Sequence, residues 1–444
     1  KAMDAVQEVA TNPDMGLNDP IRDFVISGAS KRGWTTWMTG ITDCRIKGIA
    51  PIVIDVLNMD KQMEHHRKAY GYWAPSIYDY AQERVFDAML PTAPAADQAA
   101  AQSLLSLVDP YRYINVDGYH SGKRLDMPKF LTNGTGDQFF LPDSAQWYFK
   151  DLPGSKYTNY IPNGDHGLVD VDEQIDPTTS DNPASDLLAW LMTVTQDKAK
   201  PQFSWVVQAD GSIKVTVDAA RRPKTVKMWY ATAEGSRDFR LERIGGSLYH
   251  LDPDTQQLVL NGPQWQPQLL LPTTSGGTEY VATRPVPAAG SYTGFFVQLT
   301  YANTAALPDI VTSNPSLGIT VPDLVFTTEV KMLPQNSDGT NLYPAFTGYV
   351  ANDTVTPGAP VAFPESKAPV VVLYGDAATM GADYGALLGG KIVEFIPNYV
   401  NSYKAAYNVS DATLDAEWNA QAPRIDQRIK DEMAGIAASV PIDE

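Results

Sequence analysis

The chain has 444 residues, of which 43% are hydrophobic and 19% charged, as expected for a globular protein of about two to four domains. Its 34 basic and 52 acidic residues give a net charge of −18, which excludes nucleic acid as a main ligand because such a surface repels phosphate backbones. The single cysteine, Cys44, excludes an internal disulfide framework, and no apolar run is long enough to span a bilayer.

The first two hundred residues alternate between strand and helix patterns. After a helical segment at 2–10, the predicted elements are a strand at 21–27, a helix at 31–40, strands at 46–56, 129–133 and 156–161, and helices at 144–150 and 184–197. This repetition predicts an α/β fold for residues 1–200, with a parallel, doubly wound sheet. Residues 58–125 are predicted to form a helical cap inserted between two strands.

The pattern changes after Pro201. Short alternating strands are predicted at 203–207, 213–217, 227–231, 239–244, 295–301 and 324–330. Their spacing by Gly, Pro and Asp turns favours a β-sandwich domain at 201–335. Residues 336–444 are predicted to be loop-rich and then, after a strand at 370–374, mainly helical, with Pro423 as a helix break.

The strongest local motif is Gly28-Ala29-Ser30-Lys31-Arg32-Gly33, between a predicted strand and a predicted helix. A nucleophile elbow needs this context, because a sharp turn with small neighbours pushes the serine hydroxyl out above the sheet. The motif departs from G-x-S-x-G, since Arg32 occupies the second glycine position and Gly33 follows one residue later. The alternative role of Ser30 is to cap the helix.

Two further residues complete a nucleophile–base–acid set. Asp137 and His166 each lie in a loop just after a predicted strand, in the chain order Ser, acid, His that α/β-hydrolases use. We therefore expect Ser30 to attack a carbonyl, His166 to take its proton, and Asp137 to orient the imidazole. The backbone N–H of Lys31 is expected to donate to the oxyanion.

Other residues compete with or extend this set. Asp165 and Asp143 are rival acids, and Asp143, which follows Pro142, is better placed to cap a helix. The side chains of Lys31 and Arg32 either contact an anionic group of a substrate or pair with neighbouring carboxylates. In the cap, Tyr70, Tyr72 and Trp73 either wall a substrate pocket or pack the cap against the sheet.

No metal or cofactor is predicted. His65 and His66 are adjacent and lack the i, i+4 spacing that places two ligands on one helix face. The acidic residues Asp170, Asp172, Glu173 and Asp176 lack a glycine-centred calcium loop, so we interpret them as a solvated face. His120 and His250 are isolated, which favours ordinary surface or core roles.

The motif around Ser30 resembles a known family. The string FVISGASKRGWTTW at 24–37 is similar to the hallmark of the PhoPQ-activated pathogenicity-related proteins, a family that includes autocrine proliferation repressors. The likeness continues through 51–55, 109–111, 133–137 and His166, and more thinly at 237–240 and 326–330. In that family an arginine usually follows Ser-Lys, so the resemblance implies that Ser30 is the nucleophile despite the departure from G-x-S-x-G.

The resemblance also implies location and partners. It implies a secreted or periplasmic α/β-hydrolase-like protein with a C-terminal sandwich domain. The elbow is also similar to that of glucuronoyl esterases, in which a basic residue beside the serine assists the oxyanion site, and this implies a similar role for Lys31 or Arg32. The family carries further strands before the helix at 2–10, and a sheet without them exposes an apolar edge. We therefore expect a separate N-terminal fragment to complete the sheet.

Three functions compete at this point. The first is a serine hydrolase acting on an ester or peptide bond. The second is a non-catalytic secreted signalling or binding protein with a relic triad. The third is a structural subunit of an extracellular assembly that docks through the C-terminal region. The placement of the three candidate residues favours the hydrolase.

Overall fold

The computed structural model divides into two compact units, Lys1–Thr347 and Gly348–Glu444. The residues that it describes are 1–12, 20–77, 80–81, 83–118, 122–168, 182–234, 237–244, 247–251, 258–260, 263–307, 321–344, 376–407, 409–425 and 427–440.

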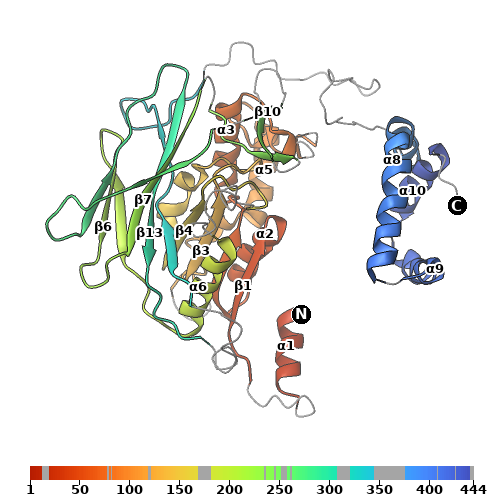
Figure 1. The fold of residues 1–444 in the computed structure, drawn as a ribbon, viewed down its shortest axis with the longest axis horizontal. Coiled ribbons are helices and arrows are strands. Elements are labelled where there is room, and N and C mark those ends of the chain that lie inside the picture. Colours follow the sequence, from red (N-terminus) through yellow and green to blue (C-terminus); the bar gives the residue numbers. More distant parts are fainter. Residues whose placement is uncertain are drawn as a thin grey trace. The chain divides into compact units, whose positions relative to one another are not determined.

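Four parallel strands form one half of the main sheet. They are β1 (Phe24–Ala29), β2 (Ile46–Ile52), β3 (Lys129–Gly134) and β4 (Lys156–Ile161), paired in this order. Helix α2 (Lys31–Thr42) follows β1, and α6 (Pro183–Thr195) comes after β4 (Figure 1). The predicted α/β class is confirmed, and these four strands are parallel as expected, whereas the whole sheet is mixed because later strands extend it.

The strands after residue 201 are distributed over three sheets. Five of them continue the main sheet beyond β4, all in antiparallel pairs: β14 (Leu324–Thr327), β13 (Tyr292–Tyr301), β7 (Thr225–Ala233), β11 (Gln266–Leu269) and β15 (Lys331–Leu333). A second sheet contains β12 (Glu279–Ala282), β6 (Ile213–Val217) and β5 (Phe203–Val207). A third contains β10 (Leu258–Leu260), β9 (Ser247–Leu251) and β8 (Glu242–Ile244). The predicted β-sandwich domain is therefore not confirmed.

Threonine side chains join the two halves of the main sheet. Thr158 of β4 donates its hydroxyl to the carbonyl of Thr327 in β14 at 2.8 Å, and the N–H of Tyr160 donates to the Thr327 hydroxyl at 3.1 Å. Alternating hydrophobicity reports that a strand has a buried face, but not which neighbour it pairs with. For this reason the sequence pattern could not place β14 beside β4.

Alternate residues of the strands face two separate cores. Ile49 and Leu131 contact the core that contains Trp37 of α2, whereas Phe130 points to the opposite core, where it stacks on Trp190 of α6. Burying a side chain of this size contributes about 1.5–3 kcal/mol. Because both faces are covered, the carboxyl ends of the strands are left as the place where polar loops converge.

The segment between β2 and β3 is mainly helical. It contains α3 (Met59–Tyr70), α5 (Ala95–Val108) and the 3₁₀ turns Pro75–Ile77, Asp87–Met89 and Pro110–Tyr113. The buried carboxylate of Asp109 anchors the start of α3 by accepting hydrogen bonds from the N–H groups of Asn58 and Met59 at 3.1 and 3.0 Å. The helix predicted at 144–150 is instead a pair of 3₁₀ turns, Ser144–Trp147 and Phe149–Asp151.

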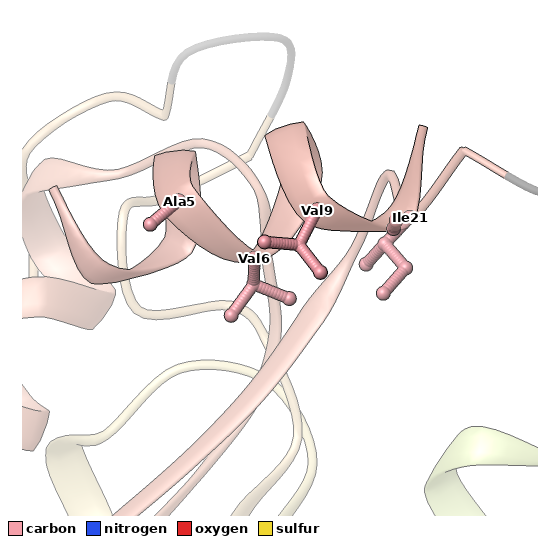
Figure 2. A pocket seen from close by; sticks show the side chains of 5 residues that line it. Ala5, Val6, Val9 and Ile21 are labelled. Carbon is pink, nitrogen blue, oxygen red and sulfur yellow. The ribbon is translucent and has the colours of Figure 1, made fainter. Parts of the chain in front are cut away.

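Helix α1 (Ala2–Ala10) exposes apolar side chains. Ala5, Val6, Val9 and Ala10 line a depression together with Ile21, and Val6 and Val9 remain 45% and 46% exposed (Figure 2). In the part of the sheet that the structure describes, β1 is the end strand.

The second unit is helical. It contains α8 (Ala377–Tyr407), α9 (Asp411–Gln421) and α10 (Gln427–Ser439), with Pro423 in a 3₁₀ turn between the last two. Helices α8 and α10 pack closely because glycines lie at their contact: a Cβ on Gly435 would be 2.2 Å from the carbonyl oxygen of Ala378. The strand predicted at 370–374 lies outside the described residues. No described helix is long and apolar enough to cross a membrane.

Candidate active site

Ser30 occupies a strained turn between β1 and α2. Its backbone angles are φ 53° and ψ −127°, in a region that residues other than glycine rarely adopt. The turn is held by a hydrogen bond from the Ser30 N–H to the carbonyl of Ile52 at 2.9 Å. Within α2, the Ser30 side chain makes no capping hydrogen bond, so its hydroxyl is available for another partner.

Two glycines make this turn possible. A Cβ on Gly28 would lie 2.6 Å from the carbonyl oxygen of Arg32, and one on Gly33 would lie 2.5 Å from Cγ2 of Ile54. In G-x-S-x-G, the glycine that allows close packing is the second residue after the serine. In this chain that glycine is Gly33, the third residue after Ser30. This explains physically why Arg32 is tolerated beside the turn.

The structure brings Ser30, His166 and Asp137 into direct contact. The Ser30 hydroxyl lies 2.9 Å from Nε2 of His166, and the Asp137 carboxylate oxygens lie 3.0 and 2.9 Å from Nδ1 of the same ring. Each residue comes from a loop at the carboxyl end of a parallel strand, β1, β4 and β3 respectively. The three residues that the sequence singled out thus form one hydrogen-bonded chain.

Asp137 is buried, with 2% of its surface exposed. Burial raises the pKa of Asp137 above its ordinary value. The hydrogen bonds from His166 and from the N–H groups of Phe139 and Phe140 favour the carboxylate and so act to lower this pKa. The two backbone N–H groups donate to Oδ1 at 2.7 and 3.2 Å. These bonds hold the carboxylate in one orientation toward the imidazole.

The loops that carry Asp137 and His166 are fixed to each other. The N–H of Gly136 donates to the carbonyl of Gly164 at 2.8 Å, and the N–H of His166 donates to the side-chain oxygen of Gln138 at 3.0 Å. A Cβ on Gly134 would lie 2.4 Å from the Gly164 oxygen, so the approach of the two loops depends on glycine. The ring of Phe139 packs on His166 with centroids 4.1 Å apart and supplies an apolar wall beside it.

Residues beyond 201 also support these loops. The N–H of Leu241 donates to the carbonyl of Gly136 at 2.9 Å. The side chain of Asn163 accepts from the Trp265 N–H at 2.7 Å and donates to the Trp265 carbonyl at 3.0 Å. Sequence reasoning missed this support, because no local pattern links these residues to a loop more than a hundred positions earlier.

The rival acids have other partners. The capping role expected for Asp143 is wrong: its buried carboxylate accepts hydrogen bonds from His65 at 3.0 Å, Arg237 at 2.6 Å and Gln146 at 2.7 Å. Burial alone would raise the pKa of Asp143. The nearby Arg237 and His65 nevertheless hold this pKa well below its usual value. The carboxylate of Asp165 accepts a hydrogen bond from the N–H of Gly167, at 2.8 Å, within its own loop.

Lys31 and Arg32 occupy the first turn of α2 and are exposed. Neither side chain has an ion-pair partner among the described residues. The alternative that Lys31 and Arg32 pair with neighbouring carboxylates therefore gains no support from these residues. Because Lys31 begins the helix, its N–H is one of the first four, which have no intrahelical acceptor. That N–H and the helix dipole favour negative charge beside Ser30.

The aromatic residues of the cap make contacts inside the protein. Tyr70 is only 3% exposed, and the Arg240 guanidinium lies 4.5 Å from its ring centre. Tyr72 accepts a hydrogen bond from Arg240, and Trp73 donates its ring N–H to Asp87 at 3.0 Å. These contacts favour packing for Tyr70, whereas Tyr72 and Trp73 are half-buried and their contact with substrate stays a prediction.

The two adjacent histidines also have protein partners. Nδ1 of His65 lies 2.7 Å from the Tyr343 hydroxyl, and Nε2 of His66 accepts a hydrogen bond from the N–H of Ala74 at 3.1 Å. No group of three His, Cys, Asp or Glu side chains that could hold a metal ion occurs among the described residues. His120 and the acidic residues at 170–176 lie outside them.

The parallel strands and the Ser–His–Asp contact define an α/β protein with a candidate serine-nucleophile site. A sequence model of the PhoPQ-activated pathogenicity-related proteins matches residues 1–240, and the chain belongs to this family. It is 33% identical over 311 residues to autocrine proliferation repressor protein A of Dictyostelium discoideum. That match covers 68% of this chain and 55% of the relative, so the chain spans about half of the relative's length.

Solved structures give only distant likeness. A puromycin-hydrolysing peptidase of Mycobacterium tuberculosis has a TM-score of 0.22 and 19% identity, covering 37% of this chain and 22% of the peptidase. An α/β hydrolase from the sediment metagenome of the Mar Chica lagoon has a TM-score of 0.22 and 13% identity, covering 40% of this chain and 64% of that enzyme. At these TM-scores the likeness supports no argument about function.

Proposed function

We propose that this protein is a serine hydrolase that cleaves an ester or peptide bond through an acyl-enzyme. One observation carries the proposal: the Ser30 hydroxyl lies 2.9 Å from Nε2 of His166, whose Nδ1 contacts both oxygens of the buried Asp137 carboxylate. A hydroxyl, an imidazole and a carboxylate in this order are the groups that nucleophilic acyl transfer requires.

The geometry supports the following steps. An imidazole that donates Nδ1–H to Asp137 presents an unprotonated Nε2 to Ser30 and takes its proton as Oγ attacks the carbonyl carbon. The tetrahedral oxyanion accepts a hydrogen bond from the Lys31 N–H. The leaving group then departs with the proton from His166, which leaves an acyl group on Ser30. Water, deprotonated by His166, attacks the acyl carbonyl and releases the acid and the free serine.

The proposal extends to substrate contacts and location. Arg32 and the Lys31 side chain are proposed to contact an anionic group of the substrate, and Tyr72 and Trp73 an apolar part. By its family, the protein is proposed to be secreted or periplasmic.

We further propose that a separate polypeptide strand pairs with β1, the end strand of the described sheet. Its backbone would satisfy the N–H and carbonyl groups along that edge. Native mass spectrometry of the protein purified from its source tests this: a second chain is expected, and a soluble monomer of this chain alone would contradict it.

Activity measurement tests the hydrolase proposal. Acyl esters, sugar-acid esters and dipeptide amides would be incubated with the wild-type protein and with Ser30→Ala. We expect at least one class to be hydrolysed, and the Ser30→Ala variant to lose that activity while keeping its thermal unfolding temperature. Equal turnover by both proteins would contradict the proposal.

A second candidate function is signalling without catalysis. It is favoured by the name of the Dictyostelium relative, an autocrine proliferation repressor protein. Under this alternative Ser30→Ala would retain full biological activity in a proliferation assay, whereas under the hydrolase proposal that activity is lost.

A further inference from the structure

Asp55 is a buried carboxyl group that the proposed mechanism does not use. It lies three residues after β2, at the same edge of the sheet as Ser30 and Asp137, and is only 2% exposed. A buried carboxyl group needs partners, because burial without hydrogen bonds is unfavourable. Its partners come from two other segments.

The Asp55 carboxylate accepts hydrogen bonds from β3 and from the segment of 3₁₀ turns that follows β3. The amide Nδ2 of Asn133 donates to both oxygens of Asp55 at 3.2 Å, and the hydroxyl of the buried Tyr148 donates to Oδ1. Asn133 lies at the end of β3, four residues before Asp137. Asp55 therefore fixes the strand end from which the Asp137 loop departs.

In the sequence, Asp55 directly follows the segment 52–54, which supports the Ser30 turn. The carbonyl of Ile52 accepts the Ser30 N–H at 2.9 Å, and Ile54 packs against Gly33 at the contact where a Cβ would be only 2.5 Å away. Between them, Val53 has φ 46°, a conformation that is strained for a β-branched residue. Strain of this kind persists only where neighbouring contacts hold it, and Asp55 supplies such contacts two residues further on.

Two other buried carboxyl groups, Asp137 and Asp143, interact electrostatically with Asp55. Burial, together with the nearby charges of Asp137 and Asp143, raises the pKa of Asp55 to about 7, although the hydrogen bonds from Tyr148 and Asn133 act to lower it. The buried Tyr160 also interacts electrostatically with Asp55. The group is thus coupled to Asp137 electrostatically as well as through Asn133.

We propose that Asp55 is a positioning residue of the candidate active site, whose hydrogen bonds to Asn133 and Tyr148 keep the Ser30 turn and the Asp137 loop in register. This inference rests on the proposed serine-hydrolase function. Asp55 does not touch the reacting atoms in this account. It acts through the backbone segments that carry Ser30 and Asp137.

The test uses diisopropyl fluorophosphate, a small neutral reagent that reacts with an activated serine. Rate constants at saturation and apparent binding constants would be measured for the wild type, Asp55→Ala and the near-isosteric Asp55→Asn. Since misplacement of about 1 Å can cost about 100-fold in rate, we expect Asp55→Ala to lower the rate constant by about that factor, with a smaller change in the binding constant. Asp55→Asn, which keeps one acceptor oxygen, is expected to lose less.

A matched control separates positioning from general destabilisation. Asp186 in α6 is also a buried aspartate, 5% exposed, that accepts a hydrogen bond from an asparagine side chain, Asn159, at 2.8 Å. We expect Asp186→Ala to lower the unfolding temperature but to leave the labelling rate of the folded protein unchanged.

Two outcomes would overturn the inference. If Asp55→Ala is labelled at the wild-type rate, Asp55 has no positioning role and the hydrolase proposal stands. Where the alanine variant does not fold, the same conclusion follows from wild-type labelling of Asp55→Asn. If the wild type itself is not labelled, the proposed function fails and this inference fails with it.

Discussion

Asp137 contacts Nδ1 of His166 through both carboxylate oxygens, at 3.0 and 2.9 Å. This contact decides which imidazole nitrogen faces Ser30, because a ring that donates Nδ1–H leaves Nε2 free to accept a proton. In Asp137→Asn the amide can donate to Nδ1 and stabilise the opposite tautomer. We expect kcat for ester hydrolysis to fall on the order of 10⁴-fold with little change in stability.

The rival acid provides the control for this variant. Asp165→Asn is expected to keep most of the activity, because the Asp165 carboxylate bonds within its own loop rather than orienting the imidazole. Steady-state kinetics of both variants distinguish the two residues, and the reverse order of effects would assign the acid role to Asp165.

Asp143 is expected to matter for stability rather than for chemistry. Its removal leaves Arg237 as a buried charge without its 2.6 Å ion pair and leaves Nε2 of His65 without its carboxylate partner. Removing one member of a buried ion pair typically costs about 3–5 kcal/mol. We expect a loss of this size in the urea-unfolding free energy of Asp143→Ala, partly restored in the double variant Asp143→Ala/Arg237→Met. Unchanged stability with lost activity would contradict this assignment.

The buried Asp55 makes stability depend on pH. Its pKa rises from 3.8 to about 7 on folding, so between these values the folded state binds more protons than the unfolded state. The free energy of unfolding contributed by Asp55 therefore falls as pH rises through this window, by on the order of 4 kcal/mol. Urea unfolding at pH 4.5 and 7.5 should show Asp55→Asn gaining stability relative to the wild type at the higher pH. A difference independent of pH would contradict it.

The cations beside Ser30 are expected to select negatively charged substrates. We compare kcat/KM for a negatively charged nitrophenyl hemiglutarate ester with kcat/KM for the uncharged pentanoate ester, and predict that the ratio of the first to the second exceeds one in the wild type. In Arg32→Gln or Lys31→Gln this ratio is expected to fall about fivefold, the upper end of the effect of an exposed ion pair. Raising the salt concentration should lower the ratio in the wild type as well. A ratio that is the same in all three proteins would exclude a role for these side chains in specificity.

Local sequence patterns predicted the parts of the site that depend on local geometry. Ser30 between a strand and a helix, and Asp137 and His166 after later strands, were predictable because parallel strands present their carboxyl ends at one edge. The contacts of Leu241 and Trp265 with the site loops, and the pairing of β14 with β4, were not. They depend on tertiary partners that a short periodic pattern does not encode. The same holds for Asp143, whose position before a helical turn suggested capping while its partners are His65 and Arg237.

Covalent labelling of Ser30 tests the central claim most directly. The protein would be treated with a fluorophosphonate probe, digested, and the modified peptide identified by mass spectrometry. The account predicts a single adduct on Ser30 that is absent in Ser30→Ala and strongly reduced in His166→Ala. An unmodified Ser30 in folded protein, or labelling that persists in Ser30→Ala, would contradict it.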